Sequence, residues 1–254
     1  MHSERASRPL LSAVFATYGQ PKVWDLQWEQ LRMLPLYFAA KMELVIVDDH
    51  GSPVATIPKD IRDRFPCKLF RVDENIAWNQ MGARNLGMQE ASAKVAVMLD
   101  PDMVPTPLVW DKIMWAAENL HEGTVVKFSL TGSDGGFIHS SPNTWILHTS
   151  DFFSIHGYDE DYAGNKGWSD VALMHTLNSA FKIERRPDIL VPYLLNTDGV
   201  EDAQVTSLDR SVQVNAKKHK AIWHEIQRRY GGNWAKWAKK KKKPVVRFPW
   251  TRIL

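Results

Sequence analysis

The sequence of residues 94 to 102 is Lys-Val-Ala-Val-Met-Leu-Asp-Pro-Asp, and it predicts a buried strand that ends at two carboxylates. Five consecutive apolar residues, Val95 to Leu99, are typical of a parallel strand that is buried on both faces. Pro101 has no N–H to donate to a neighbouring strand, so we expect the sheet to end there. Side chains at positions i and i+2 of an extended backbone point to the same side, which brings Asp100 and Asp102 together.

Two carboxylates held in this way favour a divalent cation between them. Two like charges about 4 Å apart repel by roughly 4 kcal/mol at an effective dielectric constant near 20. Mg²⁺ is commonly held by one or two carboxylates together with substrate phosphates. A second Asp-x-Asp occurs at Asp159 and Asp161, where a solvated turn is the simpler interpretation. Asp100 and Asp102 are favoured because ligands of open α/β sheets bind beyond the carboxyl ends of the strands.

Strand and helix patterns alternate through the first half of the chain, which predicts the α/β class with a mostly parallel sheet. Apolar runs predict strands at residues 10–16, 43–47, 68–72, 95–99, 124–130 and 145–148. Apolar spacing predicts helices that end before Pro35, at 78–91, at 106–120, at 151–155, from Trp168 onward and at 211–230. The helix from Trp168 is expected to direct inward Val171, Leu173, Met174 and Leu177. The second half is otherwise less regular.

The composition is that of a globular protein without disulfides. Of the 254 residues, 44% are apolar and 24% are charged, which is ordinary for a soluble domain. Cys67 is the one cysteine, so no intrachain disulfide can form and a reducing compartment is expected. No apolar run approaches the roughly 20 residues of a membrane span, and the first residues lack the apolar core of a signal peptide. These features predict a cytoplasmic protein.

The positive charge is concentrated at the C-terminus. Residues 236–254 hold eight Lys and Arg and no acidic residue, so the other residues sum to −5 within a net charge of +3. The first interpretation of this tail is a solvated, disordered end. The second is peripheral contact with an anionic membrane at about 1 kcal/mol per basic residue, because aromatic residues are interleaved with the lysines. Nucleic acid is not the expected partner.

Four segments, in the same order, resemble the GT-A glycosyltransferases, particularly the inverting family-two group. They are Val45-Ile-Val-Asp-Asp-His-Gly-Ser52, Asn75 with Ala83-Arg-Asn-Leu-Gly87, Leu99-Asp-Pro-Asp102, and Gly157-Tyr-Asp-Glu160 with Gly167-Trp-Ser-Asp170. The last segment is also similar to that of the galactosyltransferases. The resemblance covers about residues 10 to 195. It implies a Rossmann-like, mostly parallel sheet with helices on both faces, followed by an irregular second half that binds the acceptor.

The resemblance also implies a division of the chain. One GT-A domain would occupy residues 1–235, with a nucleotide-binding half at about 10–102 and an acceptor half at about 103–208. A C-terminal helix at about 209–230 would complete it, and residues 236–254 would form the basic tail.

On the donor side, the resemblance implies a nucleotide-diphosphate sugar, most plausibly linked to UDP. The residues implied to contact it are Thr17, Tyr18, Asp48, Asp49, Arg84 and Asp100. A carboxylate at the end of the second strand can accept the imide N–H of uracil, and the Arg84 fork suits a phosphate. Mn²⁺ or Mg²⁺ held by Asp100 and Asp102 would neutralise the departing diphosphate.

On the acceptor side, Asp170 is implied to be the general base that takes the proton of an acceptor hydroxyl. Trp168 and Ser169 are implied to contact the acceptor, which could be a glycan, a lipid or a protein. Ser169 stands where the family more often has Glu. Residues 191–196 contain no His that could serve as a third metal ligand, so that ligand stays open.

Two other functions remain open at the level of the sequence. A nucleotidyltransferase would use a similar sheet and similar carboxylates, but no Gly-rich loop followed by Lys lies near the first strand. A degenerate, non-catalytic GT-A domain that binds a sugar or a surface is suggested by Ser169 and by the missing His. The hypothesis that we carry forward is a metal-dependent, inverting transferase of sugars.

Overall fold

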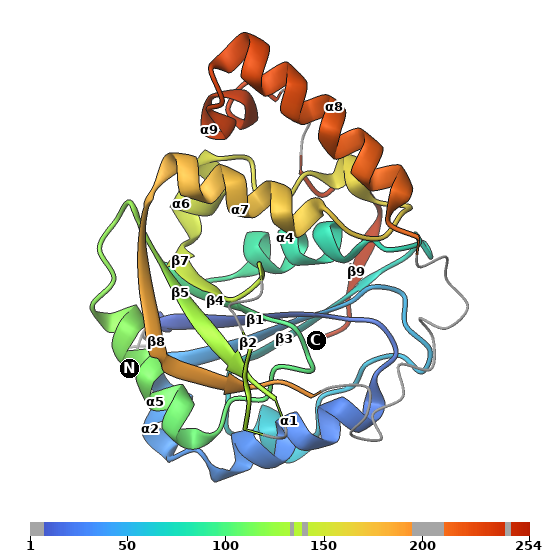
Figure 1. Cartoon of the computed structure of the whole chain (residues 1–254). Helices are drawn as coiled ribbons and strands as arrows, with labels where there is room; N and C mark the ends of the chain where they lie inside the picture. The colour runs from blue at the N-terminus through green and yellow to red at the C-terminus, as the bar shows by residue number, and fades with distance from the viewer. Residues whose placement is uncertain (1–7, 133–134, 139–141, 195–210, 242–244) are drawn as a thin grey trace, which may run out of the picture.

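Four parallel strands form the middle of one sheet in the computed structural model of the chain (Figure 1). The structure describes residues 8–132, 135–138, 142–194, 211–241 and 245–254. The central order is β4-β1-β2-β3, with all three neighbouring pairs parallel. The bounds are β1 Leu11–Thr17, β2 Met42–Asp48, β3 Cys67–Val72 and β4 Val95–Leu99. The predicted parallel sheet is confirmed in this half of the chain.

Strands from the second half extend the sheet beyond β4 and mix its directions. β7 Trp145–His148 lies antiparallel between β4 and β5 Thr124–Thr131. β5 also pairs with β6 Phe137–Ile138 and, in parallel, with β8 Lys182–Pro192. The sequence analysis did not predict β8, because its first residues are mostly charged and show no apolar run.

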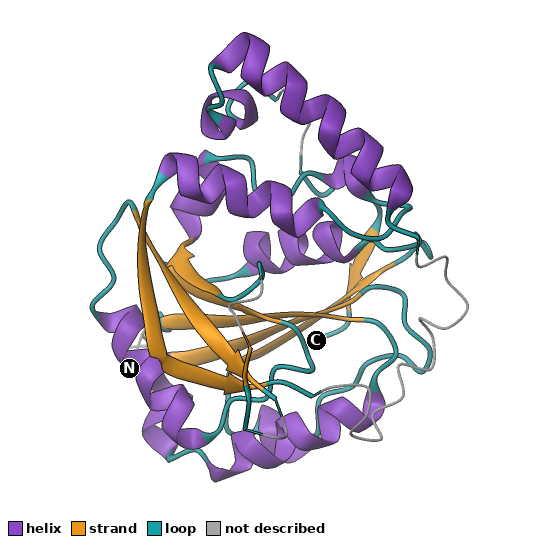
Figure 2. Cartoon of the chain, in the orientation of Figure 1, coloured by secondary structure: helices purple, strands orange, loops and turns teal. Residues whose placement is uncertain are grey.

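Helices cover both faces of the sheet (Figure 2), as predicted. One face carries α1 Pro21–Met33, α2 Leu36–Lys41, α3 Lys59–Arg62 and α5 Pro107–Glu118. The other carries α4 Gln80–Glu90, α6 Thr149–Ser154 and α7 Ser169–Ala180, with α8 Gln213–Tyr230 and α9 Trp234–Ala238 packed outside α7. In β1, Leu11 and Phe15 point into the first layer and Val14 into the second. This double burial explains why the strands are continuously apolar.

The C-terminal segment is part of the fold, so the prediction of a disordered end is wrong for its described residues. β9 Trp250–Arg252 pairs antiparallel with β3 and adds the last strand at that edge of the sheet. The Trp250 ring lies edge-on to Phe70, with 5.4 Å between ring centroids. The predicted boundary at residue 235 also does not mark a break, because α9 runs across it.

The buried face of α7 differs from the expected one. The buried positions are Ser169, Ala172, Leu173, Thr176 and Leu177, whereas Val171 and Met174 are only partly buried. The helix rotates in this way because it packs between the sheet side and the α8–α9 pair (Figure 1). A helix that is covered on two sides has no single apolar stripe from which its orientation can be derived.

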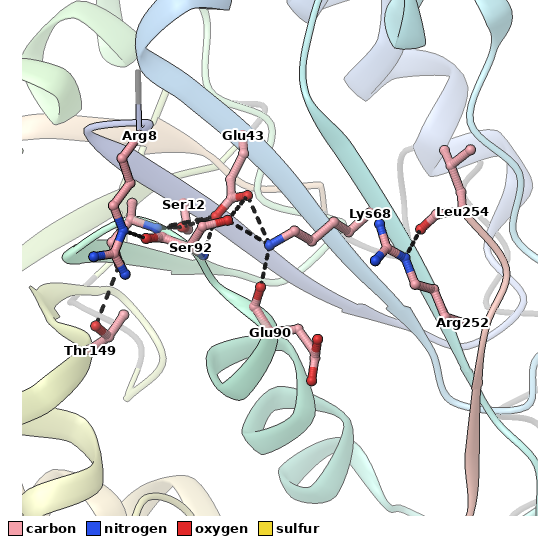
Figure 3. A network of polar contacts seen from close by, with 10 residues as sticks. Arg8, Ser12, Glu43, Lys68, Glu90, Ser92, Thr149, Arg252 and Leu254 are labelled. Carbon is pink, nitrogen blue, oxygen red and sulfur yellow. Dashed lines mark hydrogen bonds and ion pairs between the residues drawn. The ribbon is translucent and has the colours of Figure 1, made fainter. Parts of the chain in front are cut away.

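The amino-terminal edge of the sheet is held by a buried carboxylate (Figure 3). Glu43, at the start of β2, accepts hydrogen bonds from the Ser12 hydroxyl at 2.5 Å and the Ser92 hydroxyl at 2.7 Å, and pairs with Lys68 at 3.2 Å. Burial would raise the pKa of Glu43, but these partners together lower it. This cluster fixes the starts of three strands at the edge opposite to their carboxyl ends. No helix among the described residues is long and apolar enough to cross a membrane.

Candidate functional site

The carboxyl ends of β1, β2 and β4 bring most of the predicted donor-side residues to one edge of the sheet. Thr17 and Asp48 are register partners at the ends of β1 and β2, and Asp100 follows β4 directly. Parallel strands place these ends side by side, which is where open α/β sheets bind ligands. A cavity of about 260 Å³ opens between the segments after β1 and after β2. Its lining consists of Thr17, Gly19, Gln20, Pro21, Trp24, Asp25, Trp28, Pro53, Val54, Ala55 and Thr56.

Asp100 is held from two sides. Its Oδ1 pairs with the guanidinium of Arg84, a side chain from α4 that is only 3% exposed. Its Oδ2 accepts a hydrogen bond of 3.2 Å from Asn143, which the sequence analysis did not single out. The Arg84 guanidinium also lies 5.4 Å from the ring centroid of Tyr158. Arg84 and Asp100, which were both predicted to contact the donor, therefore form an ion pair with each other.

Asp102 carries the feature that fits a cation. Its Oδ1 is buried and has no hydrogen-bond partner within the part of the chain that the structure describes. Burial, and next the negative charge of Asp100, raise the pKa of Asp102 to about 7. A buried carboxylate oxygen without a donor, beside a second carboxylate, suits a hard divalent ion. Among the described residues no third His, Cys, Asp or Glu joins this pair.

Asp48, one of the predicted donor contacts, makes its contacts within the protein. Its Oδ1 accepts the Gly51 N–H at 2.6 Å, and its Oδ2 accepts the Ala55 N–H at 3.1 Å and pairs with Arg71 at 2.6 Å. The residue is completely buried. In this conformation Asp48 shapes the loop after β2 and is inaccessible to a ligand.

The other predicted donor-side residues differ in how accessible they are. The Thr17 hydroxyl accepts the indole N–H of Trp24 at 2.9 Å and is also buried. Tyr18 is partly exposed and donates to Asn75 at 3.4 Å. Thr17 therefore supports the site from behind, whereas Tyr18 remains available.

Asp49 lies between β2 and α4 rather than in solvent. Its carboxylate accepts a hydrogen bond of 3.0 Å from Asn79, the residue just before α4. Burial raises the pKa of Asp49 to about 7, partly offset by the hydrogen bond from Asn79 and by the charge of Arg84. Asn79 was missed by the sequence analysis, although a polar residue directly before a helix is a recognisable position.

Asp170 lies in the first turn of α7, as predicted, and its charge, like that of Asp100, acts on Arg84 and Tyr158. It raises the pKa of the Arg84 guanidinium as one of several neighbouring charges, and it opposes the lowering of the Lys127 pKa. Burial, and next the positive charge of Arg185, lower the pKa of Lys127 to about 7. Lys127 was missed, and its signal was a lone lysine within the apolar run of β5.

Trp168 and Ser169 precede Asp170 in an unusual backbone. Trp168 has φ 71°, which is rare for a residue other than glycine and costs about 1–3 kcal/mol. Its ring packs on His219 of α8, with 4.7 Å between centroids, so that face is covered by protein. Ser169 is buried. The predicted acceptor contacts of Trp168 and Ser169 therefore depend on the remaining ring face and on the backbone.

The structure resembles several solved structures of glycosyltransferases. No protein-family model matches the sequence, and no curated protein matches it significantly. S. aureus TarS with UDP-GlcNAc superposes with a TM-score of 0.65 over 85% of this chain and 66% of that one, at 15% identity. The chain has the GT-A fold.

Two further GT-A structures support this assignment. GalNAc-T7 with UDP, GalNAc and Mn²⁺ has a TM-score of 0.60 at 14% identity, over 87% of this chain and 50% of that one. The mannosyltransferase PcManGT of Pyrobaculum calidifontis with GDP-Man and Mn²⁺ has a TM-score of 0.53 at 12% identity, over 91% and 74%. This GT-A chain thus spans from half to about three quarters of the length of these proteins.

Proposed function

We propose that this GT-A chain is a metal-dependent glycosyltransferase that moves a sugar from a nucleotide-diphosphate donor to an acceptor hydroxyl. The observation that carries the proposal is the unpartnered, buried Oδ1 of Asp102 beside Asp100, at the carboxyl edge of the sheet. Solved structures of this fold hold UDP-GlcNAc, UDP with Mn²⁺, and GDP-Man with Mn²⁺. A UDP-sugar is the donor that we favour.

The residues divide the work as follows under this proposal. Asp100 and Asp102 hold Mn²⁺ or Mg²⁺, and the bound ion supplies charge neutralisation to the departing diphosphate. Arg84 keeps the Asp100 carboxylate oriented through their ion pair. Asp170 accepts the proton of the acceptor hydroxyl as general base. A single displacement of this kind inverts the configuration at the transferred sugar.

UDP release from UDP-GlcNAc, UDP-GalNAc and UDP-glucose, with Mn²⁺ or with EDTA, tests this function directly. We expect release for at least one donor in Mn²⁺, none in EDTA, and loss of release in Asp102→Asn. The exposed carboxylate Asp60, which pairs with Arg32, supplies the matched control Asp60→Asn, and it should keep parent activity. Absence of both UDP release and Mn²⁺-dependent UDP binding would refute the proposal. NMR of the anomeric proton of the product tests inversion.

We extend the proposal to an anionic lipid surface as the place of action, with a cytoplasmic, peripheral location. Residues 211–241 contain nine Lys and Arg and one acidic residue, Glu225, which pairs with Arg229 at 3.4 Å. The exposed basic residues are Lys217, Lys220, Arg228, Arg229, Lys236, Lys239 and Lys240. They lie on α8 and around α9, the outermost layer of the molecule (Figure 1). The basic surface is thus carried by two helices as well as by the end of the chain.

Vesicle co-sedimentation tests this surface. Replacement of Arg228, Lys239 and Lys240 by Gln removes three exposed charges, worth about 1 kcal/mol each near an anionic bilayer. We expect the affinity for vesicles with anionic phospholipid to fall on the order of 100-fold. Neutral vesicles and high salt serve as controls, because exposed charges are screened beyond about 8 Å at physiological ionic strength. Equal binding by parent and variant would refute the lipid contact.

A further inference from the structure

Glu160 is a buried carboxylate whose donors come from two distant parts of the chain. Its Oε1 accepts the Val246 N–H at 2.6 Å and the Asn85 amide at 2.7 Å, and its Oε2 accepts the Arg247 N–H at 3.1 Å. The Arg247 guanidinium adds a fourth contact at 3.4 Å. The Glu160 side chain is only 5% exposed. A buried carboxylate needs this many donors, and here most of them belong to the end of the chain.

Residues 245–254, which we call the C-terminal strap, are fixed on both sides of this contact. After Arg247 the strap passes α4, where the Phe248 ring occupies the space that a Cβ at Gly82 would need. It then forms β9 at the edge of the sheet. Val246 has φ 60°, a conformation that a β-branched residue adopts only under strain. The N–H of this strained residue is the one that reaches Glu160 at 2.6 Å.

From Glu160 the contacts continue inward to Tyr158. The Asn85 amide donates both to Glu160 and, at 3.0 Å, to the Tyr158 carbonyl, and its oxygen accepts the Tyr158 N–H at 2.9 Å. Asn85 is completely buried and follows Arg84 on α4. The backbone of Tyr158 is therefore held at two points by a residue that Glu160 orients.

Tyr158 in turn contacts both groups that hold Asp100. Its hydroxyl donates to the Asn143 oxygen at 3.0 Å, and the Asn143 amide donates to Asp100 at 3.2 Å. Its ring lies under the Arg84 guanidinium, which pairs with the other oxygen of Asp100. Burial raises the pKa of the Tyr158 phenol, so the hydroxyl remains a donor. Any shift of Tyr158 thus reaches both partners of Asp100.

We infer that the C-terminal strap positions the Asp100 carboxylate through Glu160, Asn85, Tyr158 and Asn143, which makes Glu160 and Tyr158 positioning residues of the candidate metal site. The inference rests on the proposed function in so far as Asp100 is a metal ligand. The chain of contacts is buried and continuous, which is the arrangement that can transmit a displacement between distant sites. Under this inference the acidic residues before α7 and the basic end of the chain both help to hold the candidate metal site in place.

Calorimetry of UDP binding with Mn²⁺, on the full chain, tests the inference with two variants and one control. Glu160→Gln keeps the shape but turns one acceptor oxygen into a donor group that faces other donors. Tyr158→Phe removes only the hydroxyl that contacts Asn143. Asp161→Asn is the matched control, since Asp161 pairs with the same Arg247 at 2.9 Å and the chain of contacts to Asp100 does not pass through it. We expect each of the first two variants to weaken UDP binding between about 2-fold and 30-fold, and the control to bind like the parent.

Hydrogen exchange supplies a readout that needs no ligand. The Met103 N–H is bonded to the Asp100 carbonyl at 2.9 Å, and its exchange should become several-fold faster in Glu160→Gln and Tyr158→Phe. Amides of β1 and β2 serve as internal references, because they report global unfolding. If both variants lower only the melting temperature and leave exchange at Met103 and UDP affinity unchanged, the inference is wrong. If the parent itself does not bind UDP, the proposed function fails. Hydrogen exchange at Met103 then tests by itself whether the C-terminal strap positions Asp100.

Discussion

Replacement of Asp102 by Asn should change stability in opposite directions with and without metal. The variant keeps the size of the side chain and removes one of two neighbouring negative charges. In the metal-free protein the buried Oδ1 of Asp102 has no donor, and Asp100 is already balanced by Arg84. The charge that the substitution removes is the less compensated one, because the hydrogen bond from Tyr193 and the charge of Arg84 only partly offset the effects of burial and of Asp100 on the pKa of Asp102. We expect the metal-free variant to be more stable than the parent.

The magnitude follows from the same contacts. Two like charges about 4 Å apart cost roughly 4 kcal/mol at an effective dielectric constant near 20, and the ion pair of Asp100 with Arg84 reduces this. A gain of about 1–3 kcal/mol is the reasonable range. For a chain of this length each kcal/mol shifts the melting temperature by about 2–4 °C. The variant should accordingly melt about 2–12 °C above the parent in EDTA.

Mn²⁺ should reverse this order. A ligand at 100 times its dissociation constant stabilises the folded state by about 2.7 kcal/mol, which raises the melting temperature of the parent by about 5–10 °C. Asp102→Asn lacks the charge that holds the ion and should not respond. Differential scanning calorimetry of both proteins in EDTA and across a Mn²⁺ titration measures all four values.

Two results would refute the reasoning about Asp102. A variant that is less stable than the parent in EDTA would mean that Oδ1 has a donor in solution. A variant that keeps the Mn²⁺ shift of the parent would place the metal elsewhere. Asp161→Asn, from the second Asp-x-Asp, is the control and should keep the full Mn²⁺ shift, because Asp161 pairs with Arg247 instead.

Three further predictions concern single residues. Asp170→Asn should lower transfer about 10²- to 10⁴-fold with UDP affinity unchanged by calorimetry; an equal loss in Asp161→Asn would contradict it. Asp48→Asn should destabilise the protein by about 3–5 kcal/mol in thermal unfolding, because it breaks a buried ion pair with Arg71; an unchanged melting temperature would exclude this role. The folded pKa of Lys127 is lowered from 10.5 to about 7, so its burial penalty is complete below pH 7 and disappears toward pH 10.5. Lys127→Met should thus stabilise by a few kcal/mol at pH 6 and by little at pH 10 in denaturant unfolding, whereas a constant difference would contradict the shift.

The first half of the fold could be predicted because its signals are local. The strand Val95–Leu99 matches the predicted range residue for residue, since a strand buried between two helical layers must be apolar throughout. The place of Asp100 and Asp102 follows from the same fact, as parallel strands bring their carboxyl ends to one edge.

The partners of these carboxylates could not be predicted from local sequence. Asn143 reaches Asp100 because β7 inserts antiparallel between β4 and β5, and a strand of four residues does not specify its neighbours. Lys127 belongs to β5, whose parallel partner β8 begins with mostly charged residues that do not predict a strand. The positions of Asn143 and Lys127 depend on how distant strands pair. Pairing between strands far apart in the sequence produces no periodic pattern from which it could be predicted.

Asp48 and Asp49 show why a motif does not fix the role of each residue in it. Successive side chains of a strand point to opposite sides, so two adjacent carboxylates at its end must face different surroundings. Asp48 turns toward the loop that contains Gly51 and Ala55 and is saturated there, whereas Asp49 faces α4. The motif predicted acidic residues at the end of the strand. Only the course of the loop after β2 shows that Asp48 is the carboxylate with a structural role.

The contacts of the basic C-terminal segment also could not be predicted from local sequence. Its charge suggested an external partner, yet Arg247 pairs with Glu160 and Asp161, and Lys241 pairs with Asp159. Both the acidic run and the basic end are visible in the sequence, but they meet only because the chain returns along β3 as β9. Three acidic residues next to one another would repel if left unpaired, so the end of the chain stabilises the segment that leads to Asp170. A truncation before residue 245 should therefore alter this segment and the Asp100 site, and not only remove surface charge.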